Sequence, residues 1–472
     1  MTNLSVTEPT AFASQLWAAE VASHAQLPDA RLNARLAQVL SLFAAKPLDS
    51  IPQAAGSWQQ AKPVYRFLEN ERVTPAALLQ PIADSTVRAG AAQTVIYAVH
   101  DSTSVNYSAL QHTVGLGTLN DSPSARGIHL HSALALRSDG TPLGLLDLHW
   151  WIRPPGLRTA KKRKRRRLEQ KESYKWLRSV RACQAALARN LVEGARPRLL
   201  HIMDREGDIH EVLATIADAG DSAVIRGVQN RKVADPHAHA HQAVRAAPLL
   251  GLANVAVPHH PNQPARTALV DLRALRLTIT PDTRQHPDRQ PTTWTLVEVW
   301  EMQPPTGTKP LHWLLWTTET VLTLEHALEI VRIYQLRWRI EEYHLVLKSG
   351  CNVEKLELET VERLAKAITL YAAVAVRIVA LRDLSRREPQ APCTAVLTDE
   401  EWRVLWSYIH KRPCPARTKV PTIREAVLWL GRLGGHLGRK SDGMPGVRTL
   451  WRGLRDLPLL VAGYRAGQQS LR

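Results

Sequence analysis

Residues 334–348 read Tyr334-Gln-Leu-Arg-Trp-Arg-Ile-Glu-Glu-Tyr-His-Leu-Val-Leu-Lys348. At about 100° per residue, this stretch predicts one helix with two separate stripes of side chains. The apolar stripe, typical of a helix that packs on a core, consists of Ile333, Leu336, Ile340, Tyr343 and Leu347. The polar stripe consists of Tyr334, Arg337, Glu341 and Lys348. On an isolated helix it would be a solvated face with an i,i+4 ion pair, so its meaning depends on the rest of the chain.

Composition narrows the class of protein. The chain has 472 residues, of which 44% are hydrophobic, so about two to four domains are expected. Lys and Arg number 61 against 43 Asp and Glu, and this net charge of +18 predicts a polyanionic partner such as nucleic acid. No apolar run is long enough to span a bilayer and no signal pattern opens the chain, so we expect a cytoplasmic protein without a membrane partner. The four cysteines lack C-x-x-C spacing, which indicates neither disulfides nor a zinc site.

Both ends of the chain are predicted to be helical. Residues 1–90 keep an apolar helical rhythm, and Thr74-Pro75 is typical of a cap followed by a first-turn proline. Basic residues interspersed there suit a DNA-binding domain, and an ordinary helical bundle is an equal alternative. Residues 391–472 contain two capping boxes, and we expect this region to close a dimer or to pack back on its own core.

Between these ends, residues 91–226 and 319–390 predict an α/β core. Strand and helix patterns alternate as strand, hairpin, helix, strand, helix and strand, at residues 94–101, 127–136, 142–151, 168–190, 198–204, 209–219 and 223–226. This order is that of a ribonuclease-H-like fold, in which carboxylates from neighbouring strand tips meet. The inserted residues 227–318 are predicted to be mostly β, with loops rich in Pro, His, Asp and Arg.

Two of the predicted strands end in an aspartate, Asp101 and Asp204. Each could be an ordinary turn or cap residue, but Asp208 is the better cap for the helix from residue 209, which leaves Asp204 for another role. With Glu341 they make three carboxylates able to converge. Such oxygen ligands suit Mg²⁺, with Mn²⁺ as a substitute. Two such ions roughly 3.5–4 Å apart can activate a water or a 3′-hydroxyl and stabilise the leaving oxygen of a phosphoryl transfer.

Two further clusters have both a simple and a functional interpretation. The run Lys161-Lys-Arg-Lys-Arg-Arg-Arg167 can be a solvated loop, but with this net charge we favour contact with DNA phosphates. The tract His237-Ala-His-Ala-His241 could bind a soft metal, but its proline-flanked loop favours a solvent-exposed tract.

The polar stripe also resembles a known signature. The spacing Tyr334-x(2)-Arg337-x(3)-Glu341-x(6)-Lys348 is similar to that of the DDE transposases of the insertion-sequence-four family, which are Tn-five-type enzymes of the ribonuclease-H-like superfamily. Agreement extends over nearly the whole chain, to Asp101-Ser-Thr-Ser, Asp204-Arg-Glu-Gly-Asp208, Glu172-Ser-Tyr-Lys-Trp176, Trp17 with Asp29-Ala-Arg31, and Leu430-Gly-Arg-Leu-Gly434.

The resemblance implies a metal-binding catalytic triad of Asp101, Asp204 and Glu341 that holds two Mg²⁺ ions. It implies DNA contacts from Tyr334, Arg337, Lys348, Trp313, Arg226, Arg231 and Lys232. Trp313 would stack a flipped base, an interaction worth ~1–3 kcal/mol, and a buried core tryptophan is the alternative. The resemblance also implies cut-and-paste transposition of inverted-repeat ends into target DNA, with a hairpin intermediate, by a homodimeric synaptic complex in a bacterial, nucleoid-associated setting.

Two other functions are consistent with parts of this pattern. A non-catalytic regulator derived from such a transposase would bind the same DNA, but it need keep neither the carboxylates nor the first helices. A stand-alone nuclease with the same core would need no end-recognition or dimerisation regions. The three carboxylates and the two flanking helical regions together favour the transposase.

Overall fold

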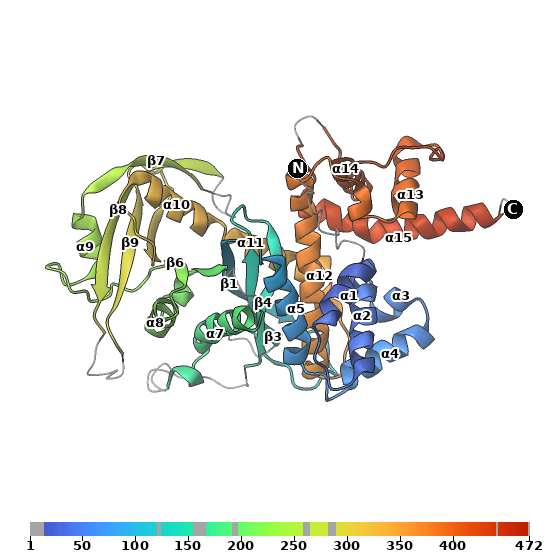
Figure 1. The fold of residues 1–472 in the computed structure, drawn as a ribbon, viewed down its shortest axis with the longest axis horizontal. Helices are drawn as coiled ribbons and strands as arrows, with labels where there is room; N and C mark the ends of the chain where they lie inside the picture. The colour runs from blue at the N-terminus through green and yellow to red at the C-terminus, as the bar shows by residue number, and fades with distance from the viewer. Residues whose placement is uncertain are drawn as a thin grey trace, which may run out of the picture.

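The structure is a computed structural model that describes residues 14–119, 124–153, 167–190, 197–257, 265–281, 289–439 and 442–470. A mixed sheet runs through the molecule, helices pack on it, and a helical region lies at each end of the chain (Figure 1). Of the basic run at residues 161–167, only Arg167 falls within the described residues.

The N-terminal region is helical, as predicted, and packs beside the long helix α12 (Val361–Arg387) (Figure 1). Its helices are α1 (Ser14–Ser23), α2 (Ala30–Ala45), α3 (Ile51–Ala55), α4 (Trp58–Glu69) and α5 (Pro75–Ala89). The side chain of Thr74 caps α5 by accepting from the Ala77 amide, and Pro75 occupies the first turn. The start that the sequence predicted for this helix is therefore confirmed.

The core sheet has the predicted order of elements. Its strands lie side by side as β4 (Pro142–Trp151), β3 (Arg126–Leu136), β1 (Val95–Asn106), β5 (Arg198–Met203) and β6 (Ser222–Arg226), with the short β2 (Gly117–Thr118) also on β3. β1 runs antiparallel to β3 and parallel to β5, and β5 runs parallel to β6. The connecting helices are α7 (Tyr174–Arg189) and α8 (His210–Asp218). This is the ribonuclease-H-like arrangement predicted from the sequence.

The insertion continues the core sheet. β10 (His312–Thr317) pairs antiparallel with β6, and then β9 (Thr292–Glu301), β8 (Arg266–Ile279) and β7 (Leu249–Val257) follow outward. β10 thereby satisfies backbone groups that the edge of β6 would otherwise leave unpaired. These four strands agree with the predicted β-rich insertion, whereas the short helix α9 (Ala240–Ala246) was not predicted.

The helix predicted to continue unbroken to residue 348 is divided. α10 (Leu324–Gln335) ends before a turn, α11 (Trp338–Leu345) follows, and residues Val346–Gly350 form a π-helical turn. The amides of residues 336, 337 and 339 bond to carbonyls three residues back, which tightens the backbone here and redirects the second helix. Gly350 is the last residue of this turn, and the residue with a left-handed backbone is Asn352, with φ 48°.

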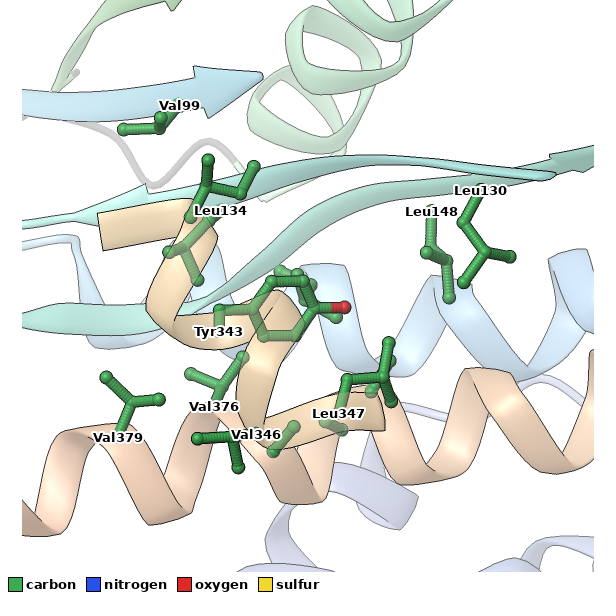
Figure 2. Packing of buried hydrophobic residues seen from close by; sticks show 14 of the residues in the cluster. Val99, Leu130, Leu134, Leu148, Tyr343, Val346, Leu347, Val376 and Val379 are labelled. Carbon is green, nitrogen blue, oxygen red and sulfur yellow. The ribbon is translucent and has the colours of Figure 1, made fainter. Parts of the chain in front are cut away.

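The apolar face of α11 is buried between the sheet and α12, as Figure 2 shows. The labelled residues of the sheet are Val99, Leu130, Leu134 and Leu148. Those of α11 and the turn that follows it are Tyr343, Val346 and Leu347, and those of α12 are Val376 and Val379. Burial of each such side chain contributes roughly 1.5–3 kcal/mol relative to exposure. The predicted apolar stripe therefore fixes α11 against the sheet.

The C-terminal region is helical, as predicted, and comprises α13 (Asp399–His410), α14 (Ile423–Leu433) and α15 (Val447–Ser470). Thr398 and Thr422 form the two predicted capping boxes. α15 packs on α14 through its first part, while residues 462–469 are exposed and project from the body of the protein (Figure 1). α12 is long and apolar enough to cross a membrane, but 89% of its most apolar window is buried, as in a core helix.

Candidate active site

Asp101 and Asp204 lie at the same edge of the core sheet. The parallel register of β1 and β5 ends with Val99 paired to Ile202, and Asp101 and Asp204 each follow two residues further along. The two carboxylates are close enough for the charge of Asp204 to contribute to the raised pKa of Asp101. β5 ends one residue before Asp204, whereas β1 continues past Asp101, paired with β3. The prediction that the first strand ends at Asp101 was therefore wrong. The antiparallel partner β3 satisfies the backbone of β1 beyond the point where β5 stops.

Arg337 bridges two of the three predicted carboxylates. Its Nη1 donates to Oδ2 of Asp101 and to Oε1 of Glu341, each at 3.3 Å. The exposed fraction of the side chain is 45% for Glu341 but only 15% for Arg337 and 14% for Asp101. The i,i+4 pair of the isolated helix is therefore present, but it is not a solvated face, because Arg337 reaches across to the sheet.

The protonation of these carboxyl groups is sensitive to their surroundings. Burial, and after it the negative charge of Glu341, raises the pKa of Asp101 to about 7. Burial likewise raises the pKa of Asp204. The Arg337 guanidinium acts in the opposite direction on both groups because it favours the charged form. A cation that binds here therefore competes with protons.

The predicted division of roles between Asp204 and Asp208 was wrong. Oδ1 of Asp204 itself caps the short 3-10 helix at residues 205–207 by accepting from the Glu206 amide at 2.8 Å. The cap position of α8 is Ile209, which makes no side-chain cap bond. Asp204 still keeps its second oxygen, Oδ2, for a further partner.

Asp208 is fully buried and organises the loop after β6. Its Oδ2 accepts from the backbone amides of Val228 and Gln229, both at 2.9 Å. Its Oδ1 pairs with Arg231, whose side chain is 9% exposed. Of the two predicted DNA contacts in this loop, Arg231 is thus held by an ion pair and Lys232 is exposed. Their contact with DNA stays a prediction.

Sequence reasoning missed His344, which the structure places among the carboxylates. It follows Glu341 by three residues on α11, so the two side chains share one face of the helix. One ring nitrogen of His344 and one oxygen each of Asp101 and Glu341 lie within 4.8 Å of one another. Burial lowers the pKa of His344 to about 3, so the ring is neutral. The Glu-x-x-His spacing, which places two ligands on one helical face, is the signal that could have identified it.

This donor set fits a divalent cation. Two carboxylates and an imidazole this close can meet around one ion after small side-chain movements. The Arg337 guanidinium already places positive charge between the carboxylates. Asp204 is outside this closest group, but its charge contributes to the raised pKa of Asp101. Among the described residues, the histidines at 237–241 form no such group.

Lys348 reaches the same sheet edge from the π-helical turn. Its Nζ donates to Oγ1 of Thr103 at 3.2 Å, two residues beyond Asp101 on β1. π-helical turns often occur at functional sites, and this one places Lys348 over the strand that carries Asp101. Lys348 and Arg337 are therefore two cations next to Asp101, an arrangement suited to binding phosphates.

Three other predicted DNA contacts form a second cluster. The rings of Trp313 on β10 and Tyr334 on α10 meet edge to face, with 5.2 Å between their centroids. Trp313 is 9% exposed and Tyr334 is 6% exposed. Burial raises the pKa of Tyr334, and the Arg226 guanidinium beside it acts against this rise. The indole is packed as a core side chain, and base stacking by Trp313 stays a prediction that requires the ring to be uncovered.

A network of ion pairs fastens α11 to α12. Arg339 and Arg382 each pair with both Glu342 and Asp383. Nε of Arg339 also donates to the carbonyl of Gly140, in the turn between β3 and β4, at 3.1 Å. The side chains of Arg339, Arg382 and Asp383 are mostly buried. The network therefore sets the position of the helix that carries two members of the carboxylate and histidine cluster.

Comparison with known proteins gives matches along most of the chain. Residues 14–73 match a family described as transposase DNA-binding, residues 146–377 match a transposase DDE domain, and residues 373–470 match a transposase Tn5 dimerisation domain. The DDE range includes Asp204 and Glu341, and Asp101 precedes it. A cryo-EM structure of a piggyBac transposase synaptic complex with hairpin DNA is similar at a TM-score of 0.36 and 9% identity, over 79% of this chain and 76% of that one. A TM-score that low does not establish a shared fold.

Proposed function

The chain belongs to the DDE transposases of the Tn-five type, and from this premise we propose that it cuts and joins DNA at transposon ends by two-metal phosphoryl transfer. As a DNA transposase it combines a DNA-binding region, a DDE domain and a dimerisation region. The DDE domain implies a divalent metal. We infer two Mg²⁺ ions, replaceable by Mn²⁺, held by Asp101, Asp204 and Glu341.

The observation that carries this proposal is the meeting of residues from distant parts of the chain. Arg337 lies 236 residues beyond Asp101 and joins its carboxylate to Glu341, while Asp101 and Asp204 each follow the last paired residues of β1 and β5 by two residues. Three carboxylates gather at one edge of the sheet, and one guanidinium bridges two of them. The remaining negative charge favours binding of a further cation.

Each of these residues has a role in the proposed reaction. Divalent cations held there would activate the attacking oxygen and stabilise the leaving one. The three carboxylates hold the cations, while Arg337 and Lys348 hold phosphates beside the bond that breaks. In the first step water adds at phosphorus and gives up a proton, while the bond from phosphorus to the 3′ oxygen breaks and that oxygen takes up a proton, which releases a 3′-hydroxyl. That hydroxyl then attacks a phosphorus of the opposite strand and gives up its proton, while the 3′ oxygen bonded to that phosphorus leaves and takes up a proton, which closes a hairpin at the transposon end.

The other predicted contacts extend the path of the DNA beyond the cut. Tyr334 and Arg226 lie together beside Trp313, so we propose that this cluster takes up the strand next to the cleavage point. Trp313 must be uncovered before it can stack a flipped base. Lys232 is exposed and available to a phosphate, whereas Arg231 must first leave its buried ion pair.

DNA and a second copy of the chain are the partners indicated by the DNA-binding and dimerisation matches. We propose that the DNA comprises inverted-repeat ends and a target duplex, brought together in a complex of two subunits. This reaction would take place at the nucleoid in a bacterial cytoplasm. A non-catalytic regulator is the second candidate, because it would use the same partners.

Cleavage of DNA by matched variants separates these functions. The full-length protein is incubated with Mg²⁺ and duplex DNA that carries its inverted repeats, in parallel with Asp101→Asn and Glu341→Gln. We expect the wild type to nick the ends, and both variants to bind the DNA without cutting it. Binding without nicking by the wild type would favour the regulator, and nicking by both variants would reject the assigned site. Cut ends without hairpins would reject only the hairpin pathway.

A further inference from the structure

His344 is buried in a way that packing alone does not explain. Its Nε2 is inaccessible to solvent and has no hydrogen-bond partner within the part of the chain that the structure describes, and only 5% of the residue is exposed. Most buried polar side-chain atoms in folded proteins have a partner, so an exception calls for a physical explanation. The neighbouring ring of Tyr343, at 5.2 Å between centroids, provides an aromatic contact but no acceptor for this nitrogen.

The His344 ring also lies beside two of the proposed metal ligands. One of its nitrogens lies within 4.8 Å of an oxygen of Asp101 and of an oxygen of Glu341, and those two oxygens also lie within 4.8 Å of each other. An ion held at about 2.0–2.1 Å from its ligands joins donor atoms up to about 4.2 Å apart. Small rotations of Glu341 toward the buried pair, with the Arg337 guanidinium displaced from between the two carboxylates, would therefore complete a shared site.

We propose that His344 is a direct nitrogen ligand of a divalent cation shared with Asp101 and Glu341, and that it makes this position prefer Mn²⁺ to Mg²⁺. The proposal rests on the metal-dependent function proposed above. Mg²⁺ takes oxygen ligands and keeps much of its water, whereas an imidazole nitrogen suits first-row transition ions. A position with two oxygens and one nitrogen from the protein is thus better suited to Mn²⁺ than one built of carboxylates alone.

The probe is MnCl₂ added to the full-length protein without DNA, observed by pulsed electron paramagnetic resonance. We expect nitrogen modulations from a directly bound imidazole, and incorporation of ¹⁵N-histidine should replace the ¹⁴N pattern with that of ¹⁵N. This measurement uses the wild-type sequence, so its result does not depend on whether a variant folds.

Substitution then identifies the histidine. His344→Gln should abolish the nitrogen modulations and lower the affinity for Mn²⁺ by about tenfold or more, while the affinity for Mg²⁺ changes much less. His210→Gln is the matched control, because His210 is also buried but its Nε2 bonds to the carbonyl of Gln290 at 3.1 Å. The control should keep both the modulations and the affinity.

The outcomes separate this proposal from the function on which it rests. Mn²⁺ that binds through Asp101 and Glu341 with oxygen ligands alone would overturn the role of His344 and leave the proposed function in place. Mn²⁺ binding that is unaffected by Asp101→Asn and Glu341→Gln would contradict the metal site itself. Nitrogen modulations that survive His344→Gln would also overturn the proposal.

Discussion

The Arg337 guanidinium lies 3.3 Å from Oδ2 of Asp101, and the same nitrogen lies 3.3 Å from Oε1 of Glu341. It therefore occupies the space between two proposed ligands of the cation. The guanidinium and a metal ion cannot both hold that place, while a DNA phosphate offers the guanidinium another partner. Binding of DNA and binding of metal should for this reason favour each other.

Removal of this guanidinium should strengthen metal binding and weaken DNA cleavage. In the protein without DNA, we expect Arg337→Gln to raise the affinity for Mn²⁺ roughly tenfold, as removal of about 1.4 kcal/mol of repulsion would. The free Mn²⁺ signal in electron paramagnetic resonance measures this affinity. Arg332→Gln is the control, because Arg332 pairs with Glu329 and not with the site. An unchanged or lower affinity in Arg337→Gln would show that the guanidinium does not compete with the ion.

The ion network between α11 and α12 should make a large contribution to stability. Asp383→Asn removes the more buried of the two carboxylates that pair with Arg339 and Arg382 and leaves only the partly exposed Glu342. Loss of one member of a buried ion pair costs roughly 3–5 kcal/mol. Urea denaturation measures the effect. Glu388→Gln, in the exposed pair with Arg387, should change stability by less than about 0.5 kcal/mol. Equal effects of the two substitutions would exclude a special role for the network.

Buried histidines should make the protein sensitive to acid. Burial holds the pKa of His131 well below its usual range, and the nearby charges of Lys175 and Arg178 act in the same direction. In the unfolded chain a histidine titrates near pH 6.5. Below about pH 6.5 the unfolded chain therefore binds a proton that the folded chain does not, and stability is lost as the pH falls from there toward the depressed pKa of the folded state.

We expect this residue alone to lower the free energy of unfolding by about 1.4 kcal/mol per pH unit in that range. Urea denaturation at pH 7.5, 6.5 and 5.5 measures the slope. His131→Gln should reduce the slope by this amount, and the same substitution at the exposed His326 should leave it as in the wild type. A slope that is the same in His131→Gln and wild type would rule out this cause.

The projecting end of α15 should matter for association and not for folding. Residues 462–469 are exposed, whereas Val461 is buried. A chain that ends at residue 461 should keep its free energy of unfolding within about 0.5 kcal/mol, but should form fewer complexes of two subunits on paired DNA ends. Denaturation and sedimentation of the DNA complex measure the two properties. Normal pairing by the shortened chain would place the dimer contact elsewhere.

Local sequence patterns predicted the order of elements and singled out Asp101 and Glu341, whose side chains the structure brings together, because strand and helix periodicity and the spacing around Glu341 are local. What they could not predict depends on contacts between distant segments. β1 continues past Asp101 because β3 lies beside it, and Asp208 became a loop anchor because residues 228–231 fold onto it. These pairings are formed only when the chain is folded.

The helix that carries Glu341 also has features that local sequence patterns did not predict. Its apolar stripe was predicted from periodicity, and the structure buries four of the five residues, with Leu336 partly buried. The break before Trp338 was not predicted, since helical periodicity continues through it in the sequence. His344 was missed because one histidine within an apolar face is usually a core residue, and only the approach of Asp101 distinguishes it.

The most direct test of the central claim is to locate the metal within the full-length protein. Fe²⁺ bound in place of Mg²⁺, with ascorbate and peroxide, produces hydroxyl radicals that cut the backbone near the ion. We predict cuts close to Asp101, Asp204 and Glu341, which excess Mg²⁺ suppresses and which Asp101→Asn and Glu341→Gln abolish. Cuts confined to other parts of the chain, or cuts at these positions that persist in both variants, would contradict a metal site built from these three carboxylates.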